Sequence, residues 1–108
     1  MEKETQDKIA ELQISENVIQ NILIQKQTLQ SQILETSNAL KELKTTKEKP
    51  YKIIGNIMIA SDKKDLEKDL NEKKEILNLK IKNLEKQEDK LKEKSQKLQQ
   101  EILKKIKK

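Results

Sequence analysis

The sequence lacks the residue types on which catalysis and cofactor binding most often depend. It contains no cysteine and no histidine, so it offers neither thiolate nor imidazole ligands for zinc and lacks the commonest general base. Its single glycine cannot form the glycine-rich loop that cradles a phosphate. We therefore expect a protein that is not an enzyme and that binds no cofactor and no metal ion.

Features of an exported or membrane protein are also missing. Without cysteine there is no disulfide framework, and nothing in the composition points to an oxidising compartment. No apolar run reaches the roughly 18 to 20 residues of a membrane span, and the opening residues MEKETQDK lack the apolar core of a signal peptide. We expect a cytoplasmic protein that does not associate with a membrane.

Arginine is absent, so all 24 basic residues are lysines, against 19 acidic residues. The charge is uneven, because residues 1–50 hold 7 lysines and 8 acids whereas residues 51–108 hold 17 lysines and 11 acids. Arginine is the usual bidentate reader of phosphate and of base edges, and here acids are interleaved with the lysines. The pattern favours solvated helix faces, and we expect no nucleic-acid partner.

What the sequence does contain is charge and spaced aliphatic residues. It is 40% charged, 32% apolar and 1% aromatic, with one proline and one glycine, which suits either long helices or disorder. The aliphatic spacing favours helix. A first helix is predicted over about residues 5–48, with an apolar residue at most positions of a heptad seam. Its a positions are Leu12, Ile19, Lys26, Ile33 and Leu40, and its d positions are Ser15, Ile22, Leu29, Thr36 and Leu43.

A second helix is predicted over about residues 63–106. Ser61 and Asp62 are favourable N-cap residues, and acids follow in the first turns. Leucine recurs at every seventh residue, which makes a line of d positions opposite a more polar line of a positions. The d positions are Leu70, Leu77, Leu84, Leu91 and Leu98, and the a positions are Glu67, Lys74, Ile81, Glu88, Ser95 and Ile102.

Between the helices lies the segment PYKIIGNIMIASD, which holds the only proline, glycine and tyrosine of the chain. Two short β-prone runs flank Gly55-Asn56, a two-residue turn signal, so we predict a β-hairpin over residues 51–60. An isolated two-stranded ribbon is not stable in water, and aliphatic residues occupy both of its faces. We infer that strands of other subunits cover it. The assembly residues are Tyr51, Ile53, Ile54, Gly55, Asn56, Ile57, Met58 and Ile59.

A turn between Gly55 and Asn56 aligns the two heptad seams in an antiparallel coiled coil. In this register three layers are polar or mixed: Ser15 with Ser95, Ile22 with Glu88, and Thr36 with Lys74. One interpretation is that these layers specify the pairing at some cost in stability. The other is that they loosen the outer part of the coil, so that it can splay and expose its aliphatic residues.

A set of short motifs lies along both helices and the hairpin. They are Gln25-Lys26-Gln27, Ala39-Leu40, Leu43, Tyr51-Lys52-Ile53-Ile54-Gly55-Asn56, Leu77, Leu79, Leu84, Lys86-Gln87-Glu88 and Leu91. With these residues the sequence resembles a prefoldin β-type subunit, as found in archaea, and also the eukaryotic β-class subunits. One hairpin, where the α class has two, favours the β class, and the lysine- and isoleucine-rich composition is similar to archaeal members.

This resemblance implies a single domain over residues 1–108 and a hetero-hexamer of two α-type and four β-type subunits. In such an assembly the hairpins pair to form a β-barrel platform from which coiled-coil arms extend. The family implies an ATP-independent holdase that captures unfolded proteins at the arm tips and delivers them to a group II chaperonin.

Client binding of this kind requires exposed aliphatic residues, and the coiled coil places both chain ends together at its tip. Ile14, Leu103 and Ile106 lie off the seam there, so closing the coil cannot bury them well. The alternative is that Leu12, Leu98 and Ile102 form only the last core layer and that the other residues belong to a frayed terminus. The predicted client-binding residues are Ile9, Leu12, Ile14, Val18, Leu98, Ile102, Leu103 and Ile106.

A structural adaptor or tether is the competing function. In that case the hairpin would serve only as a chain reversal, and the tips would bind one defined protein partner. An adaptor does not require a hairpin that is apolar on both faces, whereas Ile53 to Ile59 place aliphatic side chains on both. The hairpin pattern therefore favours the assembly interpretation.

Overall fold

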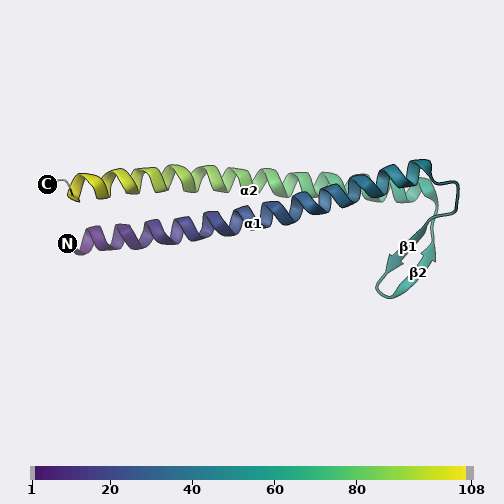
Figure 1. The fold of residues 1–108 in the computed structure, drawn as a ribbon, viewed down its shortest axis with the longest axis horizontal. Helices are drawn as coiled ribbons and strands as arrows, with labels where there is room; N and C mark the ends of the chain where they lie inside the picture. The colour runs from purple at the N-terminus through teal and green to yellow at the C-terminus, as the bar shows by residue number, and fades with distance from the viewer. Residues whose placement is uncertain (1, 107–108) are drawn as a thin grey trace. The chain divides into compact units, whose positions relative to one another are not determined.

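The computed structural model describes residues 2–106, so that Met1, Lys107 and Lys108 lie outside the described residues. The elements follow in the order α1 (Lys3–Thr45), β1 (Tyr51–Ile54), β2 (Ile57–Ala60) and α2 (Lys63–Ile106) (Figure 1). This order confirms a mainly α fold with one central hairpin. The chain forms two compact units, the terminal unit (Met1–Gln27 with Lys82–Lys108) and the hairpin unit (Thr28–Ile81).

The end of α1 comes at Thr45, before the expected end near residue 48. The Thr46 hydroxyl accepts the amide of Glu48, which a longer helix would have paired with the carbonyl oxygen of Lys44. The Oγ1 of Thr45 donates to the carbonyl oxygens of Lys41 and Glu42 at 3.4 and 3.2 Å. With Pro50 also disfavouring a helical residue before it, the helix stops early.

The start of α2 is set by Asp62. Its carbonyl oxygen accepts the first helical hydrogen bond, from the amide of Leu66 at 3.0 Å, which makes Asp62 the N-cap residue. Asp65 lies in the first turn, and Lys104 and Lys105 lie in the last turn. These charges match the positive and negative ends of the helix dipole, so both ends of α2 are stabilised as the sequence predicts.

In the terminal unit, α1 and α2 run antiparallel. Lys8 pairs with Glu101, whereas Lys26, further along α1, pairs with Glu85, which is earlier in α2. Apart from Ile9, which lies next to a d position, the covered side chains fall on the a and d positions of the predicted heptad frame, so the seam is a single stripe on each helix. Buried or half-buried members are Thr5, Lys8, Ile9, Leu12, Ser15, Ile19, Ile22 and Lys26 in α1, and Leu84, Glu88, Leu91, Ser95, Leu98 and Ile102 in α2.

The hairpin unit continues the same heptad frame. Leu40, Leu43 and Leu77 are buried, and burial of one such leucine contributes about 1.5 to 3 kcal/mol. Thr36 is also buried, and its hydroxyl donates to the carbonyl oxygen of Gln32 at 2.8 Å, so this polar seam residue is satisfied within its own helix. In the predicted polar layer of Thr36 with Lys74, the Thr36 hydroxyl is therefore not left unpaired.

Two of the polar seam positions in the terminal unit are charged and paired. The Nζ of Lys26 lies 3.4 Å from the Oε1 of Glu88 and 4.0 Å from the Oε1 of Glu85. Lys92 approaches Glu88 from the solvent side at 3.8 Å. The side chains of Lys26 and Glu88 are largely covered, so losing one partner leaves the other poorly solvated.

We predict that Lys26→Met lowers the free energy of unfolding by about 1 to 2 kcal/mol, because Glu88 then lacks its covered partner. Replacing both residues by leucine should restore or exceed the original stability, since an aliphatic layer needs no ion pair. Urea denaturation at a fixed protein concentration measures both effects.

The matched control is Lys92→Met, which removes the exposed partner of the same carboxylate and should cost no more than about 0.5 kcal/mol. Equal losses in Lys26→Met and Lys92→Met would contradict a special role for the covered pair.

Candidate functional site

The hairpin joins its strands by the shortest common connection. Tyr51 pairs with Ala60 and Ile54 pairs with Ile57, which leaves Gly55 and Asn56 as the two turn residues. Gly55 has a φ of 61°, whereas no residue other than glycine has a positive φ among the described residues. A positive φ at the first turn position alone is typical of a type II′ turn, which explains why glycine stands there.

Aliphatic side chains occupy both faces of this hairpin. Because side chains alternate along a strand and directly paired residues share a face, the register assigns four residues to each side. Every strand residue is exposed, and among the large apolar side chains the exposed fraction runs from 46% for Ile59 to 68% for Ile53. One face carries Lys52, Ile54, Ile57 and Ile59, and the other carries Tyr51, Ile53, Met58 and Ala60.

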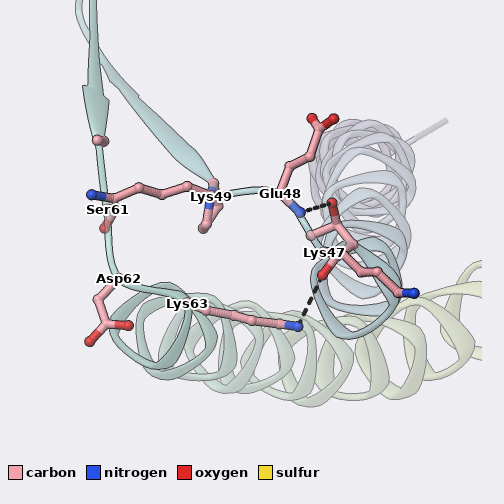
Figure 2. A pocket seen from close by; sticks show the side chains of 9 residues that line it. Lys47, Glu48, Lys49, Ser61, Asp62 and Lys63 are labelled. Carbon is pink, nitrogen blue, oxygen red and sulfur yellow. Dashed lines mark hydrogen bonds between the residues drawn. The ribbon is translucent and has the colours of Figure 1, made fainter.

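The two helix ends of the hairpin unit are tied to each other beside the base of the hairpin. Lys63 occupies a seam position of α2, but its Nζ donates to the carbonyl oxygens of Thr46 at 3.3 Å and Lys44 at 3.5 Å. Figure 2 shows the Lys63 side chain reaching toward the end of α1. These carbonyls lie where α1 ends and lack helical partners. Lys63 therefore caps α1 from the other helix, above a hollow lined by Thr46 to Pro50 and Ala60 to Lys63.

Two further contacts hold the strands. The amide of Ser61 donates to the carbonyl oxygen of Pro50 at 3.0 Å, which extends the pairing by one step below the strands. The Nζ of Lys52 lies 3.2 Å from the Oδ2 of Asp69, so strand β1 is linked to the face of α2. The hairpin is thus anchored to the helices while its aliphatic side chains stay exposed.

The second candidate surface, the terminal surface, comprises the eight predicted client-binding residues, and the structure divides this group. Ile14, Val18, Leu103 and Ile106 are exposed, with Ile14 at 63%. Ile9 and Leu12 are half-buried. Leu98 and Ile102, at 7% and 8% exposure, belong to the coiled-coil core and cannot contact a partner while the coil is closed.

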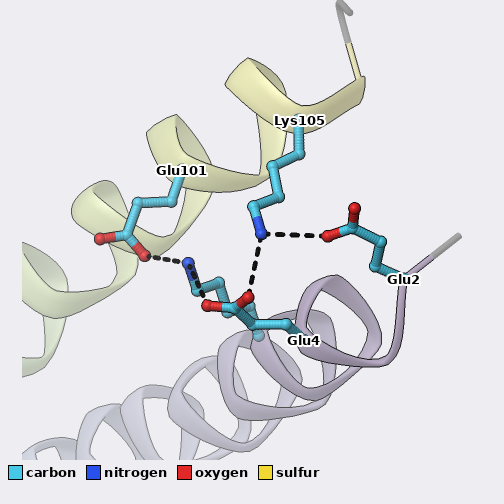
Figure 3. Close-up of polar contacts among 5 residues, drawn as sticks. Glu2, Glu4, Glu101 and Lys105 are labelled. Carbon is cyan, nitrogen blue, oxygen red and sulfur yellow. Dashed lines mark hydrogen bonds and ion pairs between the residues drawn. The ribbon is translucent and has the colours of Figure 1, made fainter.

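Ion pairs join the two helix ends beside this surface (Figure 3). Lys105 lies 3.3 Å from Glu2 and 3.2 Å from Glu4, and Lys8 lies 3.1 Å from Glu101 and 3.9 Å from Glu4. The first residues of α1 and the last turns of α2 are therefore held together by lysines of both helices. We call these five residues the terminal clasp.

The clasp shifts the titration of two of its members. The hydrogen bond and the positive charge of Lys105, with a smaller effect of Lys8, lower the pKa of Glu4. Hydrogen bonds to Glu4 and Glu2 raise the pKa of Lys105, outweighing its desolvation. The Glu4 contribution is complete above the pKa of its unfolded carboxyl and is lost as pH falls through the lower folded value. The Lys105 contribution is complete below its unfolded pKa and is lost as pH rises through the raised folded value.

Sequence reasoning did not identify the clasp, the Lys63 cap or the Lys26–Glu88 pair. Each joins residues that are distant in sequence, so only their heptad positions could have suggested them. It also left out two exposed aliphatic residues that occupy positions outside the a and d lines, Leu23 and Ile76.

Comparison with known proteins places this hairpin and its two flanking helices in a family. A family described as "Prefoldin subunit" matches residues 6–108, nearly the whole chain. The chain belongs to the prefoldin subunit family. Prefoldin family members are components of a molecular chaperone and are not enzymes.

Individual relatives support the β type. The chain is 37% identical to a prefoldin subunit beta of Archaeoglobus fulgidus, with 92% of this chain and 87% of the relative covered. It is 34% identical to one of Saccharolobus islandicus, with 92% and 80% covered. The crystal structure of the prefoldin beta subunit from Thermococcus strain KS-1 matches with a TM-score of 0.86 at 29% identity, covering 94% of this chain and 90% of that one. The predicted resemblance to archaeal β-type prefoldin is confirmed.

Across residues 2–106 of this prefoldin chain, neither helix combines the length and apolar character that crossing a bilayer demands.

For the terminal clasp, we predict that Lys105→Gln moves the pKa of Glu4 back toward the ordinary value of about 4.3 for glutamate. The cause is loss of the hydrogen bond and charge that favour the ionised carboxyl. Titration of the Glu4 side-chain carboxyl carbon by NMR measures this change.

The control is Lys104→Gln, which removes the same charge from the neighbouring exposed residue and should leave Glu4 almost unchanged. A Glu4 pKa that is the same in wild type and Lys105→Gln would show that the clasp does not form in solution.

Proposed function

We propose that this chain is a β-type subunit of a hetero-hexameric prefoldin, with two α-type subunits and four β-type copies. The hairpins of neighbouring subunits pair through their free edges and bury both apolar faces in a platform of β-barrels. The observation that carries this proposal is the exposure of aliphatic side chains on both faces of the hairpin. A strand pair of this kind is stable only when other strands cover it.

We infer that the assembled protein acts as an ATP-independent holdase. It captures unfolded proteins at the terminal surface and delivers them to a group II chaperonin. Ile14, Leu103 and Ile106 support this role, because they are exposed in the closed coil and offer a non-directional apolar contact that many sequences can use. Several arms bound to one client raise the avidity beyond that of a single weak contact.

The adaptor alternative gains no specific support. A simple chain reversal requires a tight turn but does not require apolar residues on both faces of the hairpin. Here Ile53 and Met58 lie on one face, and Ile54 and Ile57 lie on the other. The cytoplasmic location expected from the composition belongs to the same proposal, since the chaperonin and its clients meet the protein there.

Assembly can be tested on each hairpin face separately. We predict that Ile54→Lys and Ile53→Lys each prevent formation of a mixed hexamer with an α-type subunit, because a lysine would be buried without a partner in the barrel. Native mass measurement of the co-expressed subunits gives the result, and circular dichroism verifies that the helices persist.

Ile24→Lys is the control, since it changes an equally exposed aliphatic residue on α1. If both hairpin variants assemble like wild type, the hairpin is a simple chain reversal and the adaptor function is correct.

Client capture depends on the terminal surface in this proposal. Changing Ile14, Leu103 and Ile106 together to serine should reduce suppression of client aggregation about three- to tenfold, because the exposed apolar contact is lost. Assembly should remain intact. The measurement is light scattering of a thermally unfolding client at increasing concentrations of the hexamer.

The matched variant changes Ile24, Leu34 and Ile76 to serine, three similarly exposed aliphatic residues outside the terminal surface. Equal activity of the two triple variants would remove the terminal surface from client binding.

A further inference from the structure

The outer face of α2 in the terminal unit, opposite its heptad seam, carries a line of lysines. All five are exposed, and three of them recur at seven-residue intervals. At 1.5 Å per residue, the line is about 33 Å long. We call it the outer lysine stripe; its members are Lys82, Lys86, Lys90, Lys97 and Lys104.

Five other lysines of this unit form ion pairs, for example Lys94 with Glu11 and Lys8 with Glu101. The five are Lys8, Lys26, Lys92, Lys94 and Lys105. Within residues 2–106, no stripe lysine lies in an ion pair. Between residues 82 and 106, the outer face carries two acids, Asp89 and Glu93, against the five lysines, so the stripe keeps a net positive charge.

The outer face of α1 in the same unit does not complement this charge. Glutamine repeats there at the seven-residue interval, with Gln6, Gln13, Gln20 and Gln27 in one line. A second copy of the terminal unit therefore presents neutral amides on one helix and the same lysines on the other. Self-association does not account for the stripe, because its charge needs an acidic partner.

We propose that the outer lysine stripe binds carboxylate-rich segments of unfolded clients, so that this prefoldin prefers acidic clients. The proposal rests on the holdase function proposed above and adds a client class to it. Aliphatic residues of the client contact the terminal surface, while its acidic residues lie along the stripe. Electrostatic attraction of this kind mainly increases the association rate and selects partners by charge.

A polypeptide fits the stripe better than a nucleic acid does. Leu103 is exposed directly beside Lys104, and an acidic polypeptide carries aliphatic groups that can cover it. The unit contains no arginine to read phosphate with a bidentate fork and no aromatic side chain on which a base could stack.

The test uses the assembled hexamer and a reduced, alkylated acidic protein that cannot refold, before and after amidation of its carboxylates. The stripe variant changes all five lysines to glutamine, which retains helix propensity. The control variant makes the same change in charge on exposed lysines of the hairpin unit, at Lys41, Lys44, Lys64, Lys68 and Lys73. Fluorescence anisotropy gives the Kd of each hexamer variant for each form of the client at low and high salt.

We expect the stripe variant to bind the acidic client about five- to tenfold more weakly at low salt, with the difference vanishing near 1 M salt, where the Debye length is about 3 Å. Binding of the amidated client should not change, and the control variant should match wild type.

The preference for acidic clients would be overturned if the stripe and control variants lost the same affinity for the acidic client. It would also be overturned if the stripe variant lost the same affinity for the acidic and the amidated client. Neither result would contradict the holdase function. Failure of wild type to bind either client form would instead overturn the proposed function. A single-stranded oligonucleotide that displaces the acidic client and loses affinity in the stripe variant would assign the stripe to nucleic acid.

Discussion

Two helices that pack only against each other can each bury a single narrow stripe, and the rest of this structure depends on that constraint. Leucine and isoleucine at heptad positions fill most of the stripe, with Leu40 and Leu77 as buried examples. The seam has no third layer to cover it, so many of its residues are only half-buried. Polar contacts along the seam therefore contribute more to the stability and pairing of the two helices than they would beside a large, multilayered hydrophobic core.

The hairpin follows from the same lack of a thick core. Within residues 2–106, no further strand or helix covers the aliphatic faces of its strands, although Lys52 links β1 to Asp69 of α2. A hairpin that is anchored at its base and exposes isoleucines on both faces is unfavourable in an isolated chain. It is well suited to pair with strands of other subunits in a shared sheet. Membership of the prefoldin subunit family agrees with this property.

Local patterns determined most of the fold. Heptad spacing predicts both helices and their seams, because helical periodicity is a property of neighbouring residues. Gly55-Asn56 predicts the hairpin and its pairing, because a two-residue turn leaves one register. Pro50 bounded the first helix, but the Thr46 hydroxyl ended it earlier by accepting the Glu48 amide, a hydrogen bond that propensity alone does not reveal.

By itself, then, the sequence determined the element order, the seam and the off-seam exposure of Ile14, Leu103 and Ile106. The tertiary structure alone decided which long side chains meet. Lysine side chains are flexible and can reach several partners, so spacing could not assign Lys26 to Glu88, or Lys63 to the carbonyl end of α1. It also buried Leu98 and Ile102 in the core, because whether a seam residue near a helix end is covered depends on how the partner helix packs there.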